Sequence, residues 1–261
     1  MKRQLLDVIL NSEKRKKVLL LLKDGPHEMD TLLVSLDTTR QALLPQVRNL
    51  EEHHLVFHYQ DTYELTVIGK LIVNEMLPLL NITEVLDTDI EYWGTHNLSF
   101  IPHSLLKRID ELKQCKSIDV PLHEIFSENK EFTETSKKSK SVFTVSSYAF
   151  PNFEKTLQEL IANNISISII VSRALSEKLF SEHFATIQEL IKVPNISLYR
   201  YPEDFDFLQV SVNDYSLFLE LLTNEGCCDN KKIVCSSNSA VEWGRDLFDH
   251  YLKNSIPITE I

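Results

Sequence analysis

The sequence predicts an α+β chain in two parts: an N-terminal winged helix-turn-helix domain, then an α/β domain with a mixed sheet. Three observations predict this. Short helical patterns separated by turn signals fill the first 53 residues, a hairpin pattern follows them, and strand patterns alternate with helical ones after residue 141. We place the winged helix at residues 1–80, a helical linker or junction at 81–140 and the α/β domain at 141–261.

The first two predicted helices are separated by a strong stop signal. Ser12 can cap a helix over residues 12–24, whose apolar run Val18–Leu22 ends at Asp24-Gly25-Pro26. Beyond that break, four apolar residues recur at helical spacing and predict a shorter helix over residues 27–36.

The third predicted helix, over residues 39–53, has two different faces. Leu43, Val47 and Leu50 fall within one arc at about 100° per residue, which predicts the packed side. A separate arc carries arginine and glutamine, which bond guanine and adenine bidentately in the major groove or hold phosphate. This pattern is typical of a recognition helix. We predict that its DNA-contacting residues are Thr39, Arg40, Gln41, Leu44, Gln46 and Arg48.

Two features modify this recognition helix and its wing. Pro45 lies inside the helix, where the missing N–H and the ring clash predict a kink near Gln41 or a late start. Strand patterns at 55–59 and 63–66 predict a hairpin, the wing that completes the fold. Because Asp61 lies at the tip and no lysine or arginine does, we expect the wing to add little to minor-groove binding.

An apolar stripe follows the wing on a helix that opens at Thr66. Such a stripe either packs into the core or forms a dimer seam. We favour the seam and therefore a homodimer, because one small domain covers few base pairs and symmetric regulators engage two half-sites. The stripe consists of Ile68, Leu71, Ile72, Met76 and Leu79.

Charge is distributed unevenly along the chain. The first 70 residues contain ten basic and ten acidic side chains, so the formal net charge of −11 falls entirely beyond residue 70. The acidic remainder repels a polyanion, which leaves the first part as the approachable one. There we expect Lys14, Lys16 and Lys17 to contact phosphates, although most basic clusters are simply solvated helix faces.

The sequence lacks the signatures of several classes of protein. The five glycines stand singly, so neither a nucleotide-cradling glycine loop nor a GxSxG nucleophile elbow exists. No apolar run is long enough to span a membrane, and Asp7 interrupts the basic opening of the chain, so we expect a cytoplasmic protein without a membrane partner. The four cysteines are few and unevenly spread, which favours reduced thiols over a disulfide framework.

The second part reads as alternating helices and strands. A strand at 142–145, a helix opened by Pro151 and a strand at 165–171 form a βαβ unit. The remaining elements are predicted at 103–115 and 122–138 (helices of the junction), 174–192 (a long helix), 196–200, 207–212, 216–222 and 231–235 (strands), and 240–252 (a last amphipathic helix).

The sequence resembles the archaeal winged-helix transcriptional regulators that carry a methanogenesis-regulator effector domain. The resembling stretches are Ala42–Gln46 with Leu50–Glu52, Tyr63–Lys70, Asp89–Gly94, Ile101-Pro102 and Glu242–Phe248. The resemblance covers nearly the whole chain, and its Tyr-Trp-Gly and Trp-Gly pieces are fairly specific. It implies a DNA-binding regulator of methanogenic archaea whose C-terminal domain senses a signal.

At the level of fold, the second domain also resembles one half of a phospholipase D-like domain, as in sugar-sensing archaeal regulators. The catalytic HxKxxxxD motif is missing, because the strand region Val210–Ser216 holds neither histidine nor lysine. Without that pair the phosphoryl chemistry has no nucleophile, so the likeness favours binding over catalysis. We therefore expect no enzyme, no catalytic residue and no cofactor.

Alternatives remain open beside this interpretation. Cys227, Cys228 and Cys235 bracket Asp229 and suggest a redox- or metal-responsive regulator, while packed free thiols are the simpler account. His53, His54 and His58 are close in sequence, but no ligand-spaced cysteine or carboxylate supports a metal site, and we predict none. The winged helix could also be a protein-interaction module.

The main hypothesis is a homodimeric, sequence-specific regulator of transcription that binds double-stranded DNA. A small-molecule effector in the α/β domain would change the dimer geometry and hence the spacing of the two half-sites.

Overall fold

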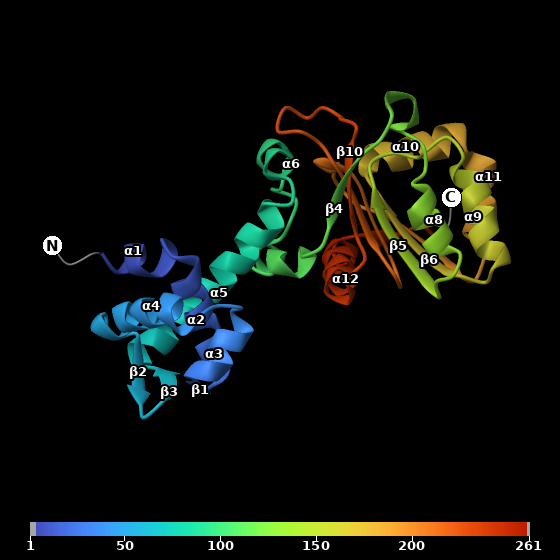
Figure 1. Ribbon diagram of the computed structural model, residues 1–261. Coiled ribbons are helices and arrows are strands. Elements are labelled where there is room, and N and C mark those ends of the chain that lie inside the picture. Colours follow the sequence, from blue (N-terminus) through green and yellow to red (C-terminus); the bar gives the residue numbers. More distant parts are fainter. Residues whose placement is uncertain (1–3, 260–261) are drawn as a thin grey trace. The chain divides into compact units, whose positions relative to one another are not determined.

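The computed structural model describes residues 4–259, which divide into two compact units on either side of the Asn81–Ile82 boundary (Figure 1). The first unit has one hydrophobic core, and the second has two. Among the described residues, no helix has the length and apolar character needed to cross a membrane.

The first unit is a winged helix-turn-helix, which confirms the predicted fold. Its elements are α1 (Leu5–Leu10), α2 (Glu13–Leu21), η1 (Leu22–Asp24), β1 (His27–Glu28), α3 (Met29–Ser35), α4 (Arg40–Glu52), β2 (Val56–Tyr59), β3 (Thr62–Leu65) and α5 (Val67–Leu86), the last of which runs across the boundary. The short α1 and β1 were not predicted. β1 joins the wing hairpin as a third strand in the order β1-β3-β2.

Local chemistry places the turns where the sequence predicted them. The Ser12 hydroxyl caps α2 by accepting a hydrogen bond from the Arg15 N–H. Asp37, between α3 and α4, has a φ of 43°, and Gln60, at the wing tip, has a φ of 55°. Aspartate tolerates this left-handed conformation better than most residues do.

Helix α4 buries the arc that its sequence predicted, with Leu43, Val47 and Leu50 fully inside the core. The helix begins at Arg40, where the Thr39 carbonyl accepts the first backbone hydrogen bonds, and it continues through Pro45. The late start that we considered because of Pro45 therefore does not occur. The proline lacks an N–H group and donates no helical hydrogen bond.

The second unit is an α/β domain built on one mixed sheet of eight strands, again as predicted. The strand order is β11-β7-β6-β5-β8-β9-β10-β4, with β5, β6 and β7 parallel and the other neighbours antiparallel. Its strands are β4 (Lys116–Asp119), β5 (Ser141–Ser146), β6 (Ser166–Val171), β7 (Ile196–Arg200), β8 (Phe207–Asn213), β9 (Leu217–Leu221), β10 (Lys231–Cys235) and β11 (Ile256–Pro257).

Helices cover both faces of this sheet (Figure 1). One core contains α12 (Asn238–Leu252), with α6 (Ile90–Thr95), α7 (His103–Leu106) and η2 (Ile109–Leu112) beside it. The opposite core contains α8 (Lys130–Ser136), α9 (Phe153–Ala162), α10 (Arg173–Glu182) and α11 (Phe184–Leu190), and η3 (Leu122–Glu124) precedes α8. Side chains of the central strands alternate between the two cores, as in β9, where Leu217 and Leu219 face one core and Phe218 faces the other.

The segment 81–140 is not the separate helical junction that we expected. Leu105, Ile109 and Leu112 are buried in the α12 core, and β4 pairs with β10 as an edge strand of the sheet. The segment therefore belongs to the second unit. The long helix predicted at 174–192 is also interrupted, since His183 separates α10 from α11.

The cysteines are not all reduced thiols, as the sequence had led us to expect. Cys115 and Cys235 form a disulfide with their Cα atoms 4.2 Å apart, although 120 positions separate them in sequence. Both lie in the α12 core, so packing of the edge strand β4 against β10 brings them together. Cys227 and Cys228 are free and exposed.

The close packing of α12 on the sheet makes Gly244 sensitive to substitution. A Cβ at Gly244 would lie 2.7 Å from Leu217 Cδ1, whereas a Cβ at Gly94, also helical, would meet nothing within 4 Å. We expect Gly244→Ala to lower the free energy of unfolding by about 1–3 kcal/mol, because the overpacked helix must move. Gly94→Ala should leave it unchanged or raise it by about 0.5–1 kcal/mol.

Urea unfolding monitored by tryptophan fluorescence measures this difference, since both tryptophans, Trp93 and Trp243, lie in the second unit. Equal unfolding midpoints for the two variants would contradict the assigned packing of α12.

Candidate nucleic-acid interface and a cavity in the second unit

Helix α4 presents a polar face on the side opposite its buried arc. Gln41 and Arg48 are exposed on this face. Neither makes a side-chain hydrogen bond or ion pair with any residue between 4 and 259. Thr39 is exposed just before the helix, and its hydroxyl makes no capping hydrogen bond. These three side chains are therefore available to a ligand.

Arg40 lies at the start of the same helix but already has a partner. Its guanidinium donates to Asp61 Oδ1 at the wing tip over 3.0 Å, and both side chains are about half exposed. A surface ion pair of this kind contributes at most about 1 kcal/mol, so Arg40 can exchange Asp61 for a phosphate at small cost. The contact also joins the wing to the recognition helix.

Gln46 does not fit the role that we predicted for it. Its Oε1 accepts hydrogen bonds from Arg15 Nη1 over 2.8 Å and from the Ser12 hydroxyl over 3.3 Å, and the side chain is half-buried. Gln46 therefore positions α4 against α2. Leu44 is likewise half-buried against the core, so only part of its side chain faces outward.

Arg15 is the residue in this region that our sequence interpretation missed. It stands in the basic run 14–17 but is 95% buried, and its Nε and Nη2 donate to the backbone carbonyls of Val8 and Asp7. Because the guanidinium thus bonds to both α1 and α4, it holds three helices together. The sequence offered one clue, in that Arg15 lies three residues after the cap Ser12 and three before the buried Val18.

The three lysines of this run differ in their surroundings. Lys14 and Lys17 are exposed, and within the described part of the chain neither has an ion-pair partner. Lys16 bonds to Glu13 Oε2 over 2.6 Å, and this contact lowers the pKa of the Glu13 carboxyl. Lys14 and Lys17 are therefore the better candidates for phosphate contacts.

Two of the three histidines after α4, His53 and His58, have different side-chain partners. His58 lies against Glu51 and stacks on Tyr63, with ring centroids 5.3 Å apart, while His53 Nδ1 bonds to the Asn49 carbonyl over 2.8 Å. No group of three or more potential metal ligands occurs among residues 4–259.

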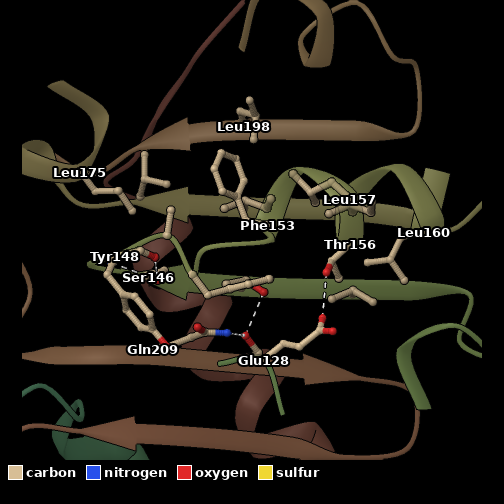
Figure 2. Close-up of a pocket in the computed structure, with 18 of the residues that line it drawn as sticks. Glu128, Ser146, Tyr148, Phe153, Thr156, Leu157, Leu160, Leu175, Leu198 and Gln209 are labelled. Atoms are coloured by element: carbon tan, nitrogen blue, oxygen red, sulfur yellow. Dashed lines mark hydrogen bonds between the residues drawn. The ribbon is translucent and has the colours of Figure 1, made fainter. Parts of the chain in front are cut away.

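The second unit contains a cavity of about 140 Å³ between the sheet and helices α8–α11 (Figure 2). Strands β5, β6 and β8 line one side of it, and the helices line the other. In Figure 2, Tyr148, Ser146 and Gln209 lie towards one end, and Thr156 and Leu160 lie towards the other. Our sequence interpretation identified no pocket in this domain.

The free cysteines lie elsewhere in the second unit, after β9. Burial and the nearby Glu220 carboxylate raise the pKa of the Cys228 thiol, which disfavours the reactive thiolate. Cys235 is in the disulfide and is no longer a thiol ligand. Asp229 lies 3.0 Å from Nε2 of His96, a buried ring that stacks on Tyr92. The three cysteines therefore do not form the metal set that we considered.

Comparisons with known proteins identify two matching family models. The model for the N-terminal domain of the methanogenesis regulatory protein FilR1 matches residues 3–84, and the model for its middle domain matches residues 125–254. The curated methanogenesis regulatory protein FilR1 of Methanothrix harundinacea is 23% identical over 97% of this chain. The chain spans 58% of that protein's length.

Two solved structures show weaker likenesses. TrmBL2, an archaeal chromatin protein, is 13% identical over 97% of each chain, with a TM-score of 0.45. A phospholipase D family member, Nuc from Salmonella typhimurium, is 11% identical over 56% of this chain and 100% of its own, with a TM-score of 0.39. Both TM-scores are too low to establish a shared fold.

The position of Arg15 predicts a structural role that its exposed neighbour lacks. Arg15→Gln should lower the stability of the first unit by about 2–4 kcal/mol, because buried hydrogen bonds from a charged donor are lost. Lys14→Gln should change it by no more than about 0.5 kcal/mol. Hydrogen exchange of the full chain, followed by mass spectrometry, should show faster exchange in α2 and α4 for Arg15→Gln alone. Unchanged exchange in that variant would refute the role of Arg15.

Proposed function

The chain belongs to the family of archaeal winged helix-turn-helix regulators that includes the methanogenesis regulatory protein FilR1, and we propose that it regulates transcription by binding double-stranded DNA sequence-specifically. The observation that carries the proposal is the polar face of α4. Gln41 and Arg48 are exposed there, while Leu43, Val47 and Leu50 hold the opposite side in the core. A helix in this position can enter the major groove.

We assign the DNA contacts to residues with available side chains. Gln41 and Arg48 contact base edges or phosphates, Thr39 and Arg40 bind at the helix start, and Lys14 and Lys17 bind phosphates. Leu44 offers an apolar contact for a thymine methyl group, and Lys16 contributes only after leaving Glu13. Gln46 is left out because Arg15 and Ser12 occupy it.

We also propose that the protein acts as a homodimer through α5. The side chains of Val67 and Leu71 are 85% and 65% exposed, and Ile68 and Leu79 are more than half exposed. Two members of the predicted seam face the core of the first unit instead, because Met76 is buried there and Ile72 is half-buried against it. An exposed apolar face of this kind on a small domain favours a protein contact. Two copies would engage two half-sites.

The second unit is proposed to sense a small molecule rather than to catalyse a reaction. Its cavity supplies a mostly apolar space, and its strand β8 lacks the histidine and lysine of a phospholipase D motif. Ligand binding would regulate DNA affinity by favouring one of two conformations.

Replacing Arg48 tests the DNA interface directly. Arg48→Ala should weaken binding to the operator by about tenfold, consistent with about 1–3 kcal/mol for one lost contact, and should leave the melting temperature unchanged. The operator is obtained first by mapping bound promoters in the host, and affinity is measured by fluorescence anisotropy. A control is Arg173→Ala, which replaces another exposed arginine, in the second unit. Undiminished affinity in folded Arg48→Ala would overturn the site.

A salt titration separates DNA binding from a protein-interaction role. Log K for DNA should fall with log salt at about −0.9 per phosphate contact. Steep salt dependence is expected because several cations are assigned to phosphates. A salt-insensitive interaction through an apolar surface would favour the protein-interaction module instead.

Releasing Arg40 from the wing should strengthen the interface. Asp61→Asn removes both the partner of Arg40 and a negative charge beside the recognition helix, so we expect DNA affinity to rise about threefold, within the range of one surface ion pair. Glu52→Gln, at the far end of α4, controls for the change in net charge. Equal effects of the two substitutions would contradict a specific contact between Arg40 and Asp61.

A further inference from the structure

The sheet face beneath the helices carries a small group of hydrogen-bonded polar side chains within a mostly apolar cavity lining. Thr144 Oγ1 of β5 lies 2.9 Å from Ser211 Oγ of β8, and Gln209 Nε2 donates to the same Ser211 oxygen over 2.7 Å. These residues alternate with the buried Val210 and Val212, which face the other core. Polar groups under helices are costly unless hydrogen-bonded. Thr144, Ser211 and Gln209 meet this requirement by bonding to one another, and they form a polar strip on the floor of the cavity.

One polar group in this cavity has no protein partner. Ser176, on α10, is 99% buried and lines the cavity, and its Oγ makes no hydrogen bond to any described residue. A hydroxyl in a helix usually bonds to a backbone carbonyl of the preceding turn or to solvent. A buried hydroxyl left without either costs about 1–3 kcal/mol. A ligand that bonds to Ser176 would remove this cost.

The charges around the cavity define what it can accept. Glu128 is the charged side chain that lines it, and no lysine, arginine or histidine among the described residues does so. Thr156 and Thr133 donate to Glu128 Oε2 over 2.8 and 3.3 Å, and Figure 2 shows the first of these bonds. Its Oε1 accepts no hydrogen bond from the described part of the chain. The site therefore repels anions and favours a group that donates hydrogen bonds.

Apolar side chains make up the remainder of the lining. Phe153, Leu157, Leu160 and Leu175 face the cavity from α9 and α10, opposite Ile167 and Ile169 of β6. The volume of about 140 Å³ is close to that of an engineered apolar cavity of about 150 Å³ that holds benzene. A body of about six carbon atoms fits such a space.

An adjoining hollow offers a route into the cavity. It has a volume of about 310 Å³, lies between the loop after β5 and helix α10, and shares Tyr148, Phe150, Phe153 and Leu175 with the cavity lining. The Tyr148 hydroxyl donates to Glu220 Oε2 over 2.7 Å, and Glu220 in turn pairs with the buried Lys232 over 2.9 Å. Burial and the Glu220 carboxylate raise the pKa of Tyr148, so this hydroxyl stays protonated and bonded to Glu220.

We propose that this cavity binds a small, mainly apolar molecule with an uncharged or cationic hydrogen-bond donor, a hydroxyl or an amine, and that it rejects carboxylates and phosphates. The apolar body lies among the leucines and isoleucines, and the donor group bonds to Glu128 Oε1 or Gln209 Oε1, with Ser176 completing the site. This inference rests on the proposed function only in one respect: that function makes the bound molecule a signal. Binding itself is independent of DNA.

The test uses three probes with the same six-carbon chain: 1-hexanol, hexylamine and hexanoate. Calorimetric titration of the full chain, without DNA, measures the affinity for each. We expect the alcohol and the amine to bind and hexanoate to bind at least about tenfold more weakly, because its charge would be buried beside Glu128 without a cation. Hexanoate binding as tightly as hexylamine would overturn the ligand class, and absence of binding by all three would overturn the site.

Two variants locate the binding within the molecule. Ser176→Leu fills the cavity and should abolish binding of the alcohol and the amine, whereas Ser181→Leu, at an exposed position on the same helix, should preserve it. Glu128→Gln should weaken hexylamine about fivefold and leave 1-hexanol within about twofold, because only the amine loses a counter-charge. Circular dichroism and the melting temperature establish that each variant is folded.

The outcomes for ligand binding and DNA binding are distinguishable. Probe binding that survives in Ser176→Leu, or an equal loss of both probes in folded Glu128→Gln, would contradict the assigned cavity and its charge. DNA binding measured with Arg48→Ala tests the proposed function separately. If ligand binding is disproved, the proposal for DNA binding is unaffected, and the reverse also holds.

Discussion

The buried guanidinium of Arg15 is the interaction on which the geometry of the first unit depends. It bonds to carbonyls of α1 and to the side chain of Gln46 on α4, while its own helix is capped by Ser12. These contacts fix the rotation of α4 about its axis. Together with the buried arc of Leu43, Val47 and Leu50, they keep the polar face of α4 at the surface. The buried Arg15 thus helps to determine that Arg48 lies at the surface.

Much of this unit followed from the spacing of apolar residues alone. The apolar arc of α4 and the stop at Asp24-Gly25-Pro26 are local patterns, and local patterns determine where a helix begins and which side it buries. The partners of individual polar side chains are not local. Gln46 and Arg48 lie about 200° apart on a helical wheel, with Gln46 beside the buried arc, but the wheel does not show that Arg15 bonds to Gln46. Sequence periodicity therefore predicted the fold well and the site only in part.

In the second unit, too, the sequence predicted local elements but not contacts between residues far apart in the chain. The βαβ unit was predicted because its elements are contiguous, whereas β4 and its disulfide partner strand are brought together across 120 positions. The polar alternation of Gln209, Ser211 and Asn213 was visible in the sequence, and on its own it suggests a solvated sheet face. The structure places all three beneath helices. Gln209 and Ser211 line the cavity and Asn213 bonds to α8, so this alternation marks buried polar contacts rather than a solvated face.

The disulfide between Cys115 and Cys235 has a consequence for the topology of the whole second unit. It closes a covalent ring that contains strands β4 to β10 and every helix lining the cavity. A protease that cuts one peptide bond inside this ring leaves a single molecule rather than two fragments. Only a second cut, or a reductant, separates the pieces, so the second unit retains its connectivity after a nick that would divide an open chain.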